Sequence, residues 1–385
     1  MASKTAWMLR GTGKMVHSIP ASTIQPASAE VSSESGFEVL CGYNWHEDEK
    51  TISVPGGPPK WAPLPLPATL SPNSDHRNMD QVTTQVPVHP FEPVFQAMSI
   101  TNPDMRLDEV DIIVNRNSLR KLLDFVSGKQ QYAFRMDLHM VKDTLFICRR
   151  ERNFGSLVHG PHDPGFGHSF EDAFTKTEEE LKSSGGHHRV IRYRLGQLNC
   201  IVRFEVDAYY EDSDESNSAS TSPQALEDAI NLMAHLDLNQ APPQSAMKGA
   251  TMVVRRGTFV SSSKLAEIKL GKSAGAIPQL WFGRTPHLLT GKHDGGVVNS
   301  TRHTHEGLRF GEWEADNQDK LRKLVSLLAE LKRVVSKTQG KAAILLCRHK
   351  GAPLQIFEAK NGIRVLPADI LAKHWDLREL KGNQE

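Results

Sequence analysis

The stretch Ile201-Val202-Arg203-Phe204-Glu205-Val206-Asp207 predicts a β-strand that ends in two alternating acidic side chains. The stretch Leu265-Ala266-Glu267-Ile268-Lys269 predicts a second strand, in which Glu267 lies sixty residues after Asp207. Alternate side chains of a strand share a face, so the two acids of the first stretch point to one side, and Glu267 and Lys269 of the second do the same. We expect the two strands to bring three carboxylates and one ammonium group together.

Three carboxylates beside one ammonium group are typical of a site for a hard divalent cation. Mg²⁺ and Mn²⁺ prefer such oxygen ligands, and an adjacent lysine can orient or activate a water molecule against a phosphodiester. The PD-(D/E)XK nucleases use this combination of metal-binding carboxylates and a lysine. Without a metal or a basic partner, Glu205 and Asp207 on one face would repel each other by some tenths to about 1 kcal/mol. Glu267 and Lys269 alone are also compatible with a same-face ion pair.

Three further segments supply polar side chains that could surround these strands. Gly167-His168-Ser169-Phe170-Glu171 opens a helix-compatible segment and adds a fourth carboxylate. Residues 277–283 are typical of a helix that can direct Gln279 to the site, and a strand follows them. Upstream, Asp111-Ile112-Ile113-Val114-Asn115-Arg116 precedes a short amphipathic segment at residues 119–125.

Taken in order, these segments resemble the DXO-type RNA decapping nucleases, from about residue 111 to about residue 360. The matching positions are Arg116, Gly167 with Phe170 and Glu171, Glu205 with Asp207, Glu267 with Lys269, and Gln279 with Gly283 and Gly291. The resemblance implies an α+β fold with a PD-(D/E)XK-like core, in which helices flank a mixed central sheet and a second, smaller sheet is present. It also implies metal-dependent hydrolysis at the 5′ end of RNA, by decapping, 5′-pyrophosphate hydrolysis or 5′→3′ exonuclease action, and an exoribonuclease partner.

The resemblance assigns a role to each polar position. It implies two Mg²⁺ or Mn²⁺ ions held by Glu171, Glu205, Asp207 and Glu267. Its catalytic residues are Lys269, Glu267, Asp207, Gln279 and Arg116. Arg116 and Gln279 would also bind substrate, and Arg203 and Arg194 join them because they lie in or near the strand that leads to Glu205. Phe204, Ala208 and Leu270 depart from the residues usual in the family, which bears on substrate preference.

Other functions remain open at this stage. A DNA nuclease of the same superfamily would keep the same carboxylates. A non-catalytic RNA-binding partner protein would have lost a metal ligand, and none is missing here. The segment from Tyr43 to Gly56 is also similar to fungal proteins that carry a prenyl-diphosphate synthase name. That chemistry needs Asp-rich helices, and the sequence contains no Asp-Asp pair.

Composition sets loose limits on partners and location. The 385 residues include 46 basic and 45 acidic side chains, so RNA binding would need a local basic groove. Candidates are the basic runs at residues 149–152, 187–194 and 255–256. Four well-separated cysteines suit a reducing compartment, and no apolar run reaches the ~20 residues of a membrane span. We expect a nuclear or cytoplasmic protein, although the acid-free first 29 residues also fit a mitochondrial transit peptide.

The chain is expected to be unevenly organised. Residues 1–85 predict a disordered or extended, Pro-rich N-terminal region. Residues 86–378 predict a single catalytic domain, interrupted at about residues 211–249 by an acidic, Ser/Pro-rich surface insertion. The polar stretch after Gly291, with His293, His303 and His305, predicts a loop. The apolar spacing at residues 321–335 predicts an amphipathic helix.

Overall fold

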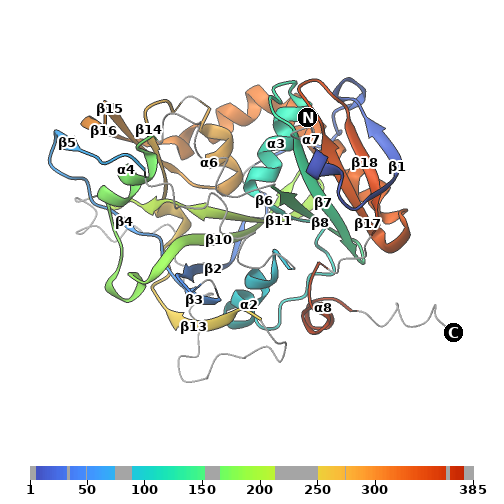
Figure 1. Ribbon diagram of the computed structural model, residues 1–385, viewed down its shortest axis with the longest axis horizontal. Coiled ribbons are helices and arrows are strands. Elements are labelled where there is room, and N and C mark those ends of the chain that lie inside the picture. Colours follow the sequence, from blue (N-terminus) through green and yellow to red (C-terminus); the bar gives the residue numbers. More distant parts are fainter. Residues whose placement is uncertain are drawn as a thin grey trace.

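Two β-sheets form the frame of the molecule, and helices pack against them (Figure 1). The computed structural model describes residues 6–32, 35–48, 50–73, 89–151, 165–212, 250–273, 275–360 and 365–376. The described α-helices are α2 (Glu92–Thr101), α3 (Arg116–Val126), α4 (Gly167–Ala173), α6 (Ile277–Gly283), α7 (Phe310–Ser336) and α8 (Ala368–His374). This arrangement confirms the α+β fold class.

The larger sheet is mixed. Its described strands are β1 (Thr12–Ile19), β2 (Glu38–His46), β3 (Thr51–Pro55), β6 (Ile112–Asn115), β7 (Phe134–Val141), β8 (Thr144–Arg150), β10 (Ser184–Leu195), β11 (Leu198–Val206), β13 (Met252–Arg256), β17 (Ala342–Cys347) and β18 (Leu354–Ala359). Their order is β1-β18-β17-β7-β8-β6-β11-β10-β2-β3-β13. β10 and β11 form an antiparallel hairpin, whereas β6 runs parallel to both β11 and β8.

The smaller sheet carries the second acidic stretch. Its described strands are β4 (Lys60–Trp61), β5 (Ala68–Thr69), β9 (Thr175–Lys176), β12 (Ala208–Tyr209), β14 (Leu265–Leu270), β15 (His287–Asp294) and β16 (Val297–His305), in the order β5-β16-β15-β14-β12-β4-β9. The chain leaves the larger sheet at Val206 and enters the smaller one at Ala208. Asp207 therefore lies at the junction of the two sheets.

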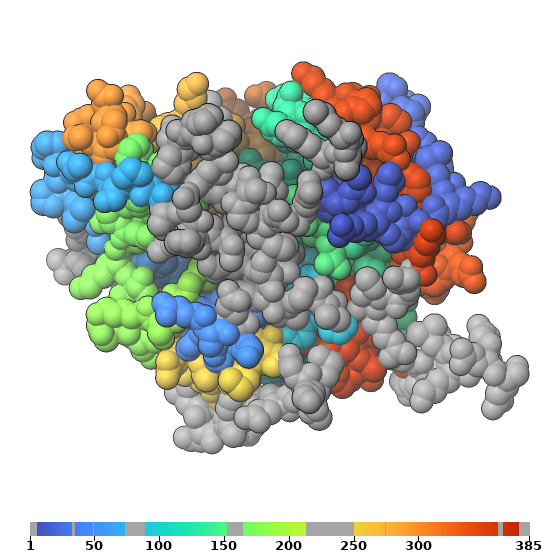
Figure 2. All heavy atoms as spheres, in the orientation of Figure 1, coloured from blue at the N-terminus to red at the C-terminus, as the bar shows by residue number. Residues whose placement is uncertain are grey.

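The N-terminal region differs from the sequence-based expectation. β1 pairs antiparallel with β18, and Figure 2 shows the blue N-terminal residues packed beside the red C-terminal strands. β2 pairs with β10 near the centre of the molecule. The strand β2 was not predicted because it is buried on both faces, so it lacks the alternation that marks a half-buried strand. Residues 74–88, and 213–249 of the expected insertion, lie outside the described residues.

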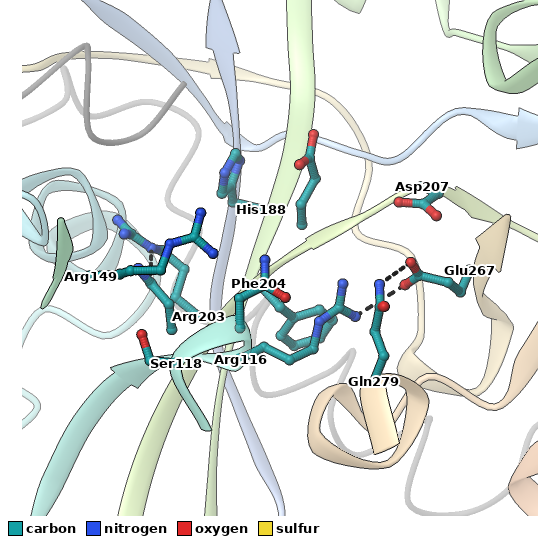
Figure 3. A pocket seen from close by; sticks show the side chains of 12 residues that line it. Arg116, Ser118, Arg149, His188, Arg203, Phe204, Asp207, Glu267 and Gln279 are labelled. Carbon is teal, nitrogen blue, oxygen red and sulfur yellow. Dashed lines mark hydrogen bonds and ion pairs between the residues drawn. The ribbon is translucent and has the colours of Figure 1, made fainter. Parts of the chain in front are cut away.

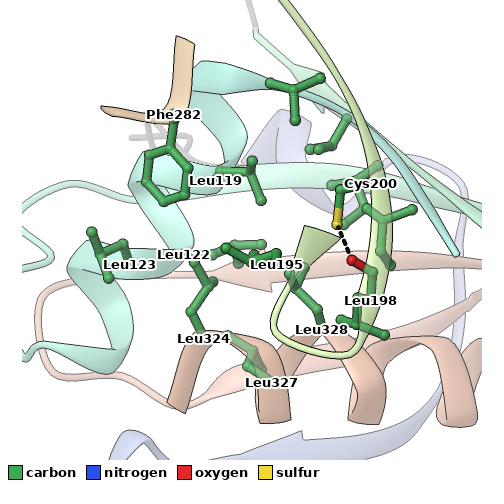
Figure 4. Close-up of a cluster of buried hydrophobic side chains, with 14 of the residues drawn as sticks. Leu119, Leu122, Leu123, Leu195, Leu198, Cys200, Phe282, Leu324, Leu327 and Leu328 are labelled. Carbon is green, nitrogen blue, oxygen red and sulfur yellow. Dashed lines mark hydrogen bonds between the residues drawn. The ribbon is translucent and has the colours of Figure 1, made fainter. Parts of the chain in front are cut away.

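Helices cover both faces of the larger sheet. On one face, leucines of α3 and α7 pack with Phe282 of α6 against the β10–β11 hairpin (Figure 4). On the other face, Phe95 of α2 and Trp375, which follows α8, are buried against the sheet. α7 confirms the amphipathic helix expected at residues 321–335. None of the helices in the described ranges is long and apolar enough to span a membrane.

The polar stretch after Gly291 is a β-hairpin, which corrects the expected loop. β15 continues to Asp294 and pairs antiparallel with β16, with His287 opposite His305. The hairpin turns at Gly295 and Gly296, whose positive φ angles of 55° and 92° favour glycine. Most side chains of β16 are partly or fully exposed, so the strand lacks the apolar residues by which a sequence pattern reveals a strand.

Candidate active site

A single buried carboxylate, that of Glu267 on β14, lies at the centre of the candidate site (Figure 3). Its Oε1 accepts hydrogen bonds from Lys269 Nζ at 2.5 Å and from the side-chain amide of Gln279. Its Oε2 forms an ion pair with Arg116 Nη1 at 3.2 Å. Glu267 thus connects β14 with α6 and α3.

Asp207 reaches the same cluster through strand pairing. β12 runs antiparallel to β14, with Ala208 opposite Ala266. This register places Asp207 beside the second acidic stretch. Its Oδ2 accepts a hydrogen bond from the Ile268 amide at 2.8 Å and lies 3.8 Å from Lys269 Nζ. The structure therefore brings Asp207, Glu267 and Lys269 together, as the two strands of the sequence predict.

The two carboxylates differ in their tendency to ionise. Burial and the neighbouring Glu267 raise the pKa of Asp207 well above its usual value. Burial alone would raise the pKa of Glu267 too, but Lys269 and Arg116 outweigh burial and lower that pKa. Burial opposes the charge of Lys269, yet Glu267 and Asp207 raise its pKa. One proton is therefore favoured on Asp207, which hydrogen-bonds to ionised Glu267.

The donor atoms decide whether this cluster suits a divalent cation. Within the part of the chain that the structure describes, no group of three or more His, Cys, Asp or Glu side chains is arranged so that it could hold a metal ion. The donors are nevertheless hard oxygens, and Glu171 adds to the negative potential at Asp207. A cation in place of the proton that Asp207 and Glu267 share would offset their charge. The carboxylates of Asp207 and Glu267 therefore offer two donors of the kind that a hard divalent cation prefers.

Glu171 and Glu205 lie at the edge of the cluster. Glu171 extends from α4, which is anchored by the fully buried ring of Phe170, and its Oε2 lies 3.2 Å from His168 Nδ1. Glu205 is exposed and lies against Gly186 of β10, where a Cβ atom would overlap its carboxylate. A side chain at position 186 would therefore displace the Glu205 carboxylate from this position.

The cluster forms one wall of a cavity of about 150 Å³, which is about five times the volume of a water molecule. The lining residues are Asn115, Arg116, Asn117, Ser118, Arg149, His188, Arg203, Phe204, Glu205, Asp207, Glu267 and Gln279. Figure 3 shows Arg149 and Arg203 on the side away from Asp207 and Glu267, with Arg116 between them. Acidic and basic side chains thus occupy opposite ends. Arg149 and His188 belong to two of the basic runs named from the sequence.

The two arginines expected near Glu205 have different locations. Arg203 lines the cavity, is 2% exposed, and donates from Nη1 to the Pro90 carbonyl at 2.7 Å. Arg194 is exposed and pairs with Asn199 near the turn of the β10–β11 hairpin. Asn199 and Arg203 are four residues apart on β11, or about 13 Å. The structure therefore does not bring Arg194 into the site, because proximity in sequence does not fix position along a strand.

Arg120, which orients Gln279, was not among the site residues predicted from the sequence. Arg120 Nη1 donates to Gln279 Oε1 at 2.7 Å, which directs the amide nitrogen of Gln279 to Glu267. Arg120 lies one turn after Arg116 on α3, so the two side chains share a helix face. The four-residue spacing from Arg116 could therefore have predicted that Arg120 lies near the site. Ser118, which also lines the cavity, carries no comparable pattern.

In metal-free buffer, Asp207→Asn is expected to stabilise the protein at pH 8. The pKa of Asp207 is raised in the folded state. Its contribution to the free energy of unfolding is therefore fully present below the unfolded-state pKa and is lost as pH rises through the folded-state pKa. Each unit of elevation corresponds to about 1.4 kcal/mol, and asparagine does not titrate. Urea unfolding between pH 4 and pH 8 should show the difference growing with pH. The exposed Asp316→Asn control should show no such trend, and a pH-independent difference at position 207 would contradict the prediction.

The architecture is shared with proteins of known structure. Scheffersomyces stipitis Rai1 matches with a TM-score of 0.60 and 10% identity, over 94% of this chain and 98% of that chain. Candida albicans Rai1 in complex with pU5-Mn²⁺ matches with a TM-score of 0.57 and 11% identity, over 94% and 99%. K. lactis Dxo1 in complex with manganese matches with a TM-score of 0.53 and 8% identity, over 91% and 99%. The fold is therefore that of the Rai1 and Dxo1 structures, which confirms the resemblance at the level of fold.

The family is shown by a separate comparison. A family model described as "Domain of unknown function (DUF8563)" matches residues 13–375, and the chain belongs to this family. The match begins within β1, so it includes the N-terminal strands of the larger sheet. No curated protein matches the chain.

Proposed function

We propose that the protein is a divalent-metal-dependent hydrolase that acts on phosphate bonds at the 5′ end of RNA. The observation that carries the proposal is the cluster of Asp207, Glu267 and Lys269, which surrounds the buried carboxylate of Glu267 beside a cavity. The fold supports it, because one neighbour of this fold is a complex with pU5-Mn²⁺ and another is a complex with manganese. The two large β-sheets also argue against a prenyl-diphosphate synthase, whose chemistry needs Asp-rich helices.

Four carboxylates would hold the metal in this proposal: Glu171, Glu205, Asp207 and Glu267. Two Mg²⁺ or Mn²⁺ ions are expected, and when bound they would lower the pKa of a water molecule and offset charge on the phosphate. Lys269 keeps Glu267 ionised, which a metal ligand requires. Its Nζ also donates to the Ile268 carbonyl at 2.9 Å, so the ammonium group is fixed on the strand that carries Glu267.

Arg116 and Gln279 would act on the substrate phosphate. Arg116 lines the cavity, and its guanidinium group lies over the Phe204 ring at 5.1 Å. A fixed cation at this point stabilises negative charge that develops on a phosphate oxygen during hydrolysis. Gln279 is held at both ends of its amide, by Arg120 and by Glu267. Its orientation is therefore set before a water molecule or a phosphate group arrives.

The first test is hydrolysis of defined RNA ends. The purified protein is incubated with Mn²⁺ and short RNAs that bear a 5′-triphosphate, a 5′-monophosphate, a methylated cap or an NAD end. We expect metal-dependent release that the Glu205→Ala/Asp207→Ala variant reduces by about 100-fold or more. The control is Glu312→Ala/Asp316→Ala, which removes one exposed glutamate and one exposed aspartate from α7 and should retain full activity.

The other outcomes separate the alternatives. If the protein binds Mn²⁺ but hydrolyses no RNA, duplex DNA is the next substrate, since a DNA nuclease of the same superfamily would use the same acids. If it binds no divalent metal at all, the proposed active site is wrong. The preferred RNA end would name the reaction. An exoribonuclease partner and the cellular location remain predictions from the sequence.

A further inference from the structure

The basic end of the cavity is built around the N-terminus of α3. This 11-residue helix begins at Arg116, and its first residues, Arg116, Asn117 and Ser118, line the cavity. The first amide groups of a helix have no partners within the helix, and they carry a partial positive charge. A helix start that lines a cavity is suited to an anion, but this feature alone does not define a site.

The residue that would normally cap this helix is used for another purpose. Asn115 occupies the N-cap position but makes no side-chain capping hydrogen bond. Its Oδ1 instead accepts a hydrogen bond from Arg203 Nε at 2.8 Å. The guanidinium group of Arg203 is further fixed by the Pro90 carbonyl and by the Phe91 ring, whose centroid lies 4.6 Å away. The cap residue therefore holds a buried cation at the cavity and leaves the helix start uncapped.

Several buried polar atoms on this wall have no hydrogen-bond partner among the described residues, and two of them belong to side chains outside the acidic cluster. These two are the hydroxyl of Ser118, which is 0% exposed, and Nη2 of Arg203, which is 2% exposed. Both side chains line the cavity. Leaving a buried donor unsatisfied costs about 1–3 kcal/mol, and more for a charged group. A ligand with acceptor oxygens would satisfy the serine hydroxyl, the arginine and the helix amides together.

We propose that this basic end is a second phosphate-binding subsite, distinct from the acidic cluster. The inference rests on the proposed function, and it assigns the subsite to a phosphate that does not react. Arg203 and Glu205 point to the same side of β11 and are two residues, or about 7 Å, apart. That distance is comparable to one phosphate-to-phosphate step along an extended RNA strand. The subsite would therefore bind the phosphate adjacent to the one undergoing hydrolysis, with Arg149 as a further cation on the same side (Figure 3).

The subsite can be tested without metal and without catalysis. Thermal unfolding is followed in EDTA while inorganic phosphate, the dinucleotide UpU or uridine is added at constant ionic strength. Phosphate and UpU should raise the melting temperature of the wild type as ligands that bind only the folded state, and uridine should not. Ser118→Ala and Arg203→Lys should each weaken phosphate affinity by about tenfold, because each removes a hydrogen bond to a charged group. The exposed Arg194→Gln variant should respond as the wild type does.

The readout is the ligand-dependent shift, so a change in the stability of a variant alone does not affect the result. With Mn²⁺ and RNA, Ser118→Ala should raise KM with little change in kcat, because the subsite binds ground state and transition state alike. If the wild-type protein hydrolyses no RNA but still responds to phosphate, the proposed function is overturned and the subsite stands. Absence of a phosphate response in the wild type, or an unchanged response in both variants, would overturn the subsite.

Discussion

Glu267→Gln is expected to reduce kcat/KM for RNA hydrolysis by about 100-fold or more. The substitution preserves the shape of the side chain but removes the charge that Lys269 and Arg116 face. It also removes a metal ligand of the proposed site. Loss of one preorganised electrostatic contact commonly costs 10²- to 10³-fold in rate. Single-turnover hydrolysis of a 5′-triphosphate RNA in Mn²⁺ would measure the effect.

The matched control is Glu179→Gln, whose side chain is 86% exposed and lies outside the cavity. It makes the same chemical change at the surface and should leave kcat/KM within about twofold, as surface substitutions usually do. Circular dichroism would verify that both variants are folded. Glu267→Gln with activity close to that of the wild type would show that the carboxylate at the centre of the cluster has no part in the reaction.

Arg116→Met is expected to destabilise the metal-free protein by about 3–5 kcal/mol. The side chains of Arg116 and Glu267 are 6% and 2% exposed, so removal of the guanidinium group leaves a buried carboxylate with one cation fewer. Removing one partner of a buried ion pair typically costs this much, and Lys269 alone would then compensate the charge of the carboxylate. Equilibrium unfolding in urea, with EDTA present, would measure the change.

Two further variants test whether burial of the ion pair explains the loss of stability in Arg116→Met. Arg333→Met removes an arginine whose side chain is 51% exposed in its pair with Glu330, and it should leave the free energy of unfolding close to that of the wild type, because exposed ion pairs contribute little. Arg116→Met/Glu267→Leu removes both buried charges and should recover much of the stability lost in the single variant. If the double variant were as unstable as Arg116→Met, the loss of stability in Arg116→Met would come from lost packing and not from the under-compensated charge of Glu267.

Local sequence patterns were sufficient to predict the acidic half of the site. Asp207, Glu267 and Lys269 lie in or directly beside short apolar strands, and strand geometry fixes which side chains share a face. The apolar residues of the helix α7 likewise recur at helical spacing and are buried. For these elements, local periodicity and tertiary structure agree.

The basic half of the site depends on long-range pairing that no local pattern reveals. Arg203 enters the cavity because β11 pairs with β6, whose last residue is Asn115. Arg194 carries the same charge but lies at the other end of the same hairpin. β1 and β2 were missed for a related reason, since their partners β18 and β10 are distant in sequence. Such contacts depend on the register between strands, and a single sequence does not encode register in its periodicity.

The passage of the chain from one sheet to the other at Asp207 has a mechanical consequence. Glu267 and Lys269 belong to the smaller sheet, whereas Glu205 and Arg203 belong to the larger one. A cation or an RNA end that contacts both groups would cross-link the two sheets. Ligand binding should therefore make the sheets unfold as one cooperative unit, and sliding of one sheet against the other would separate the reacting phosphate from its neighbour.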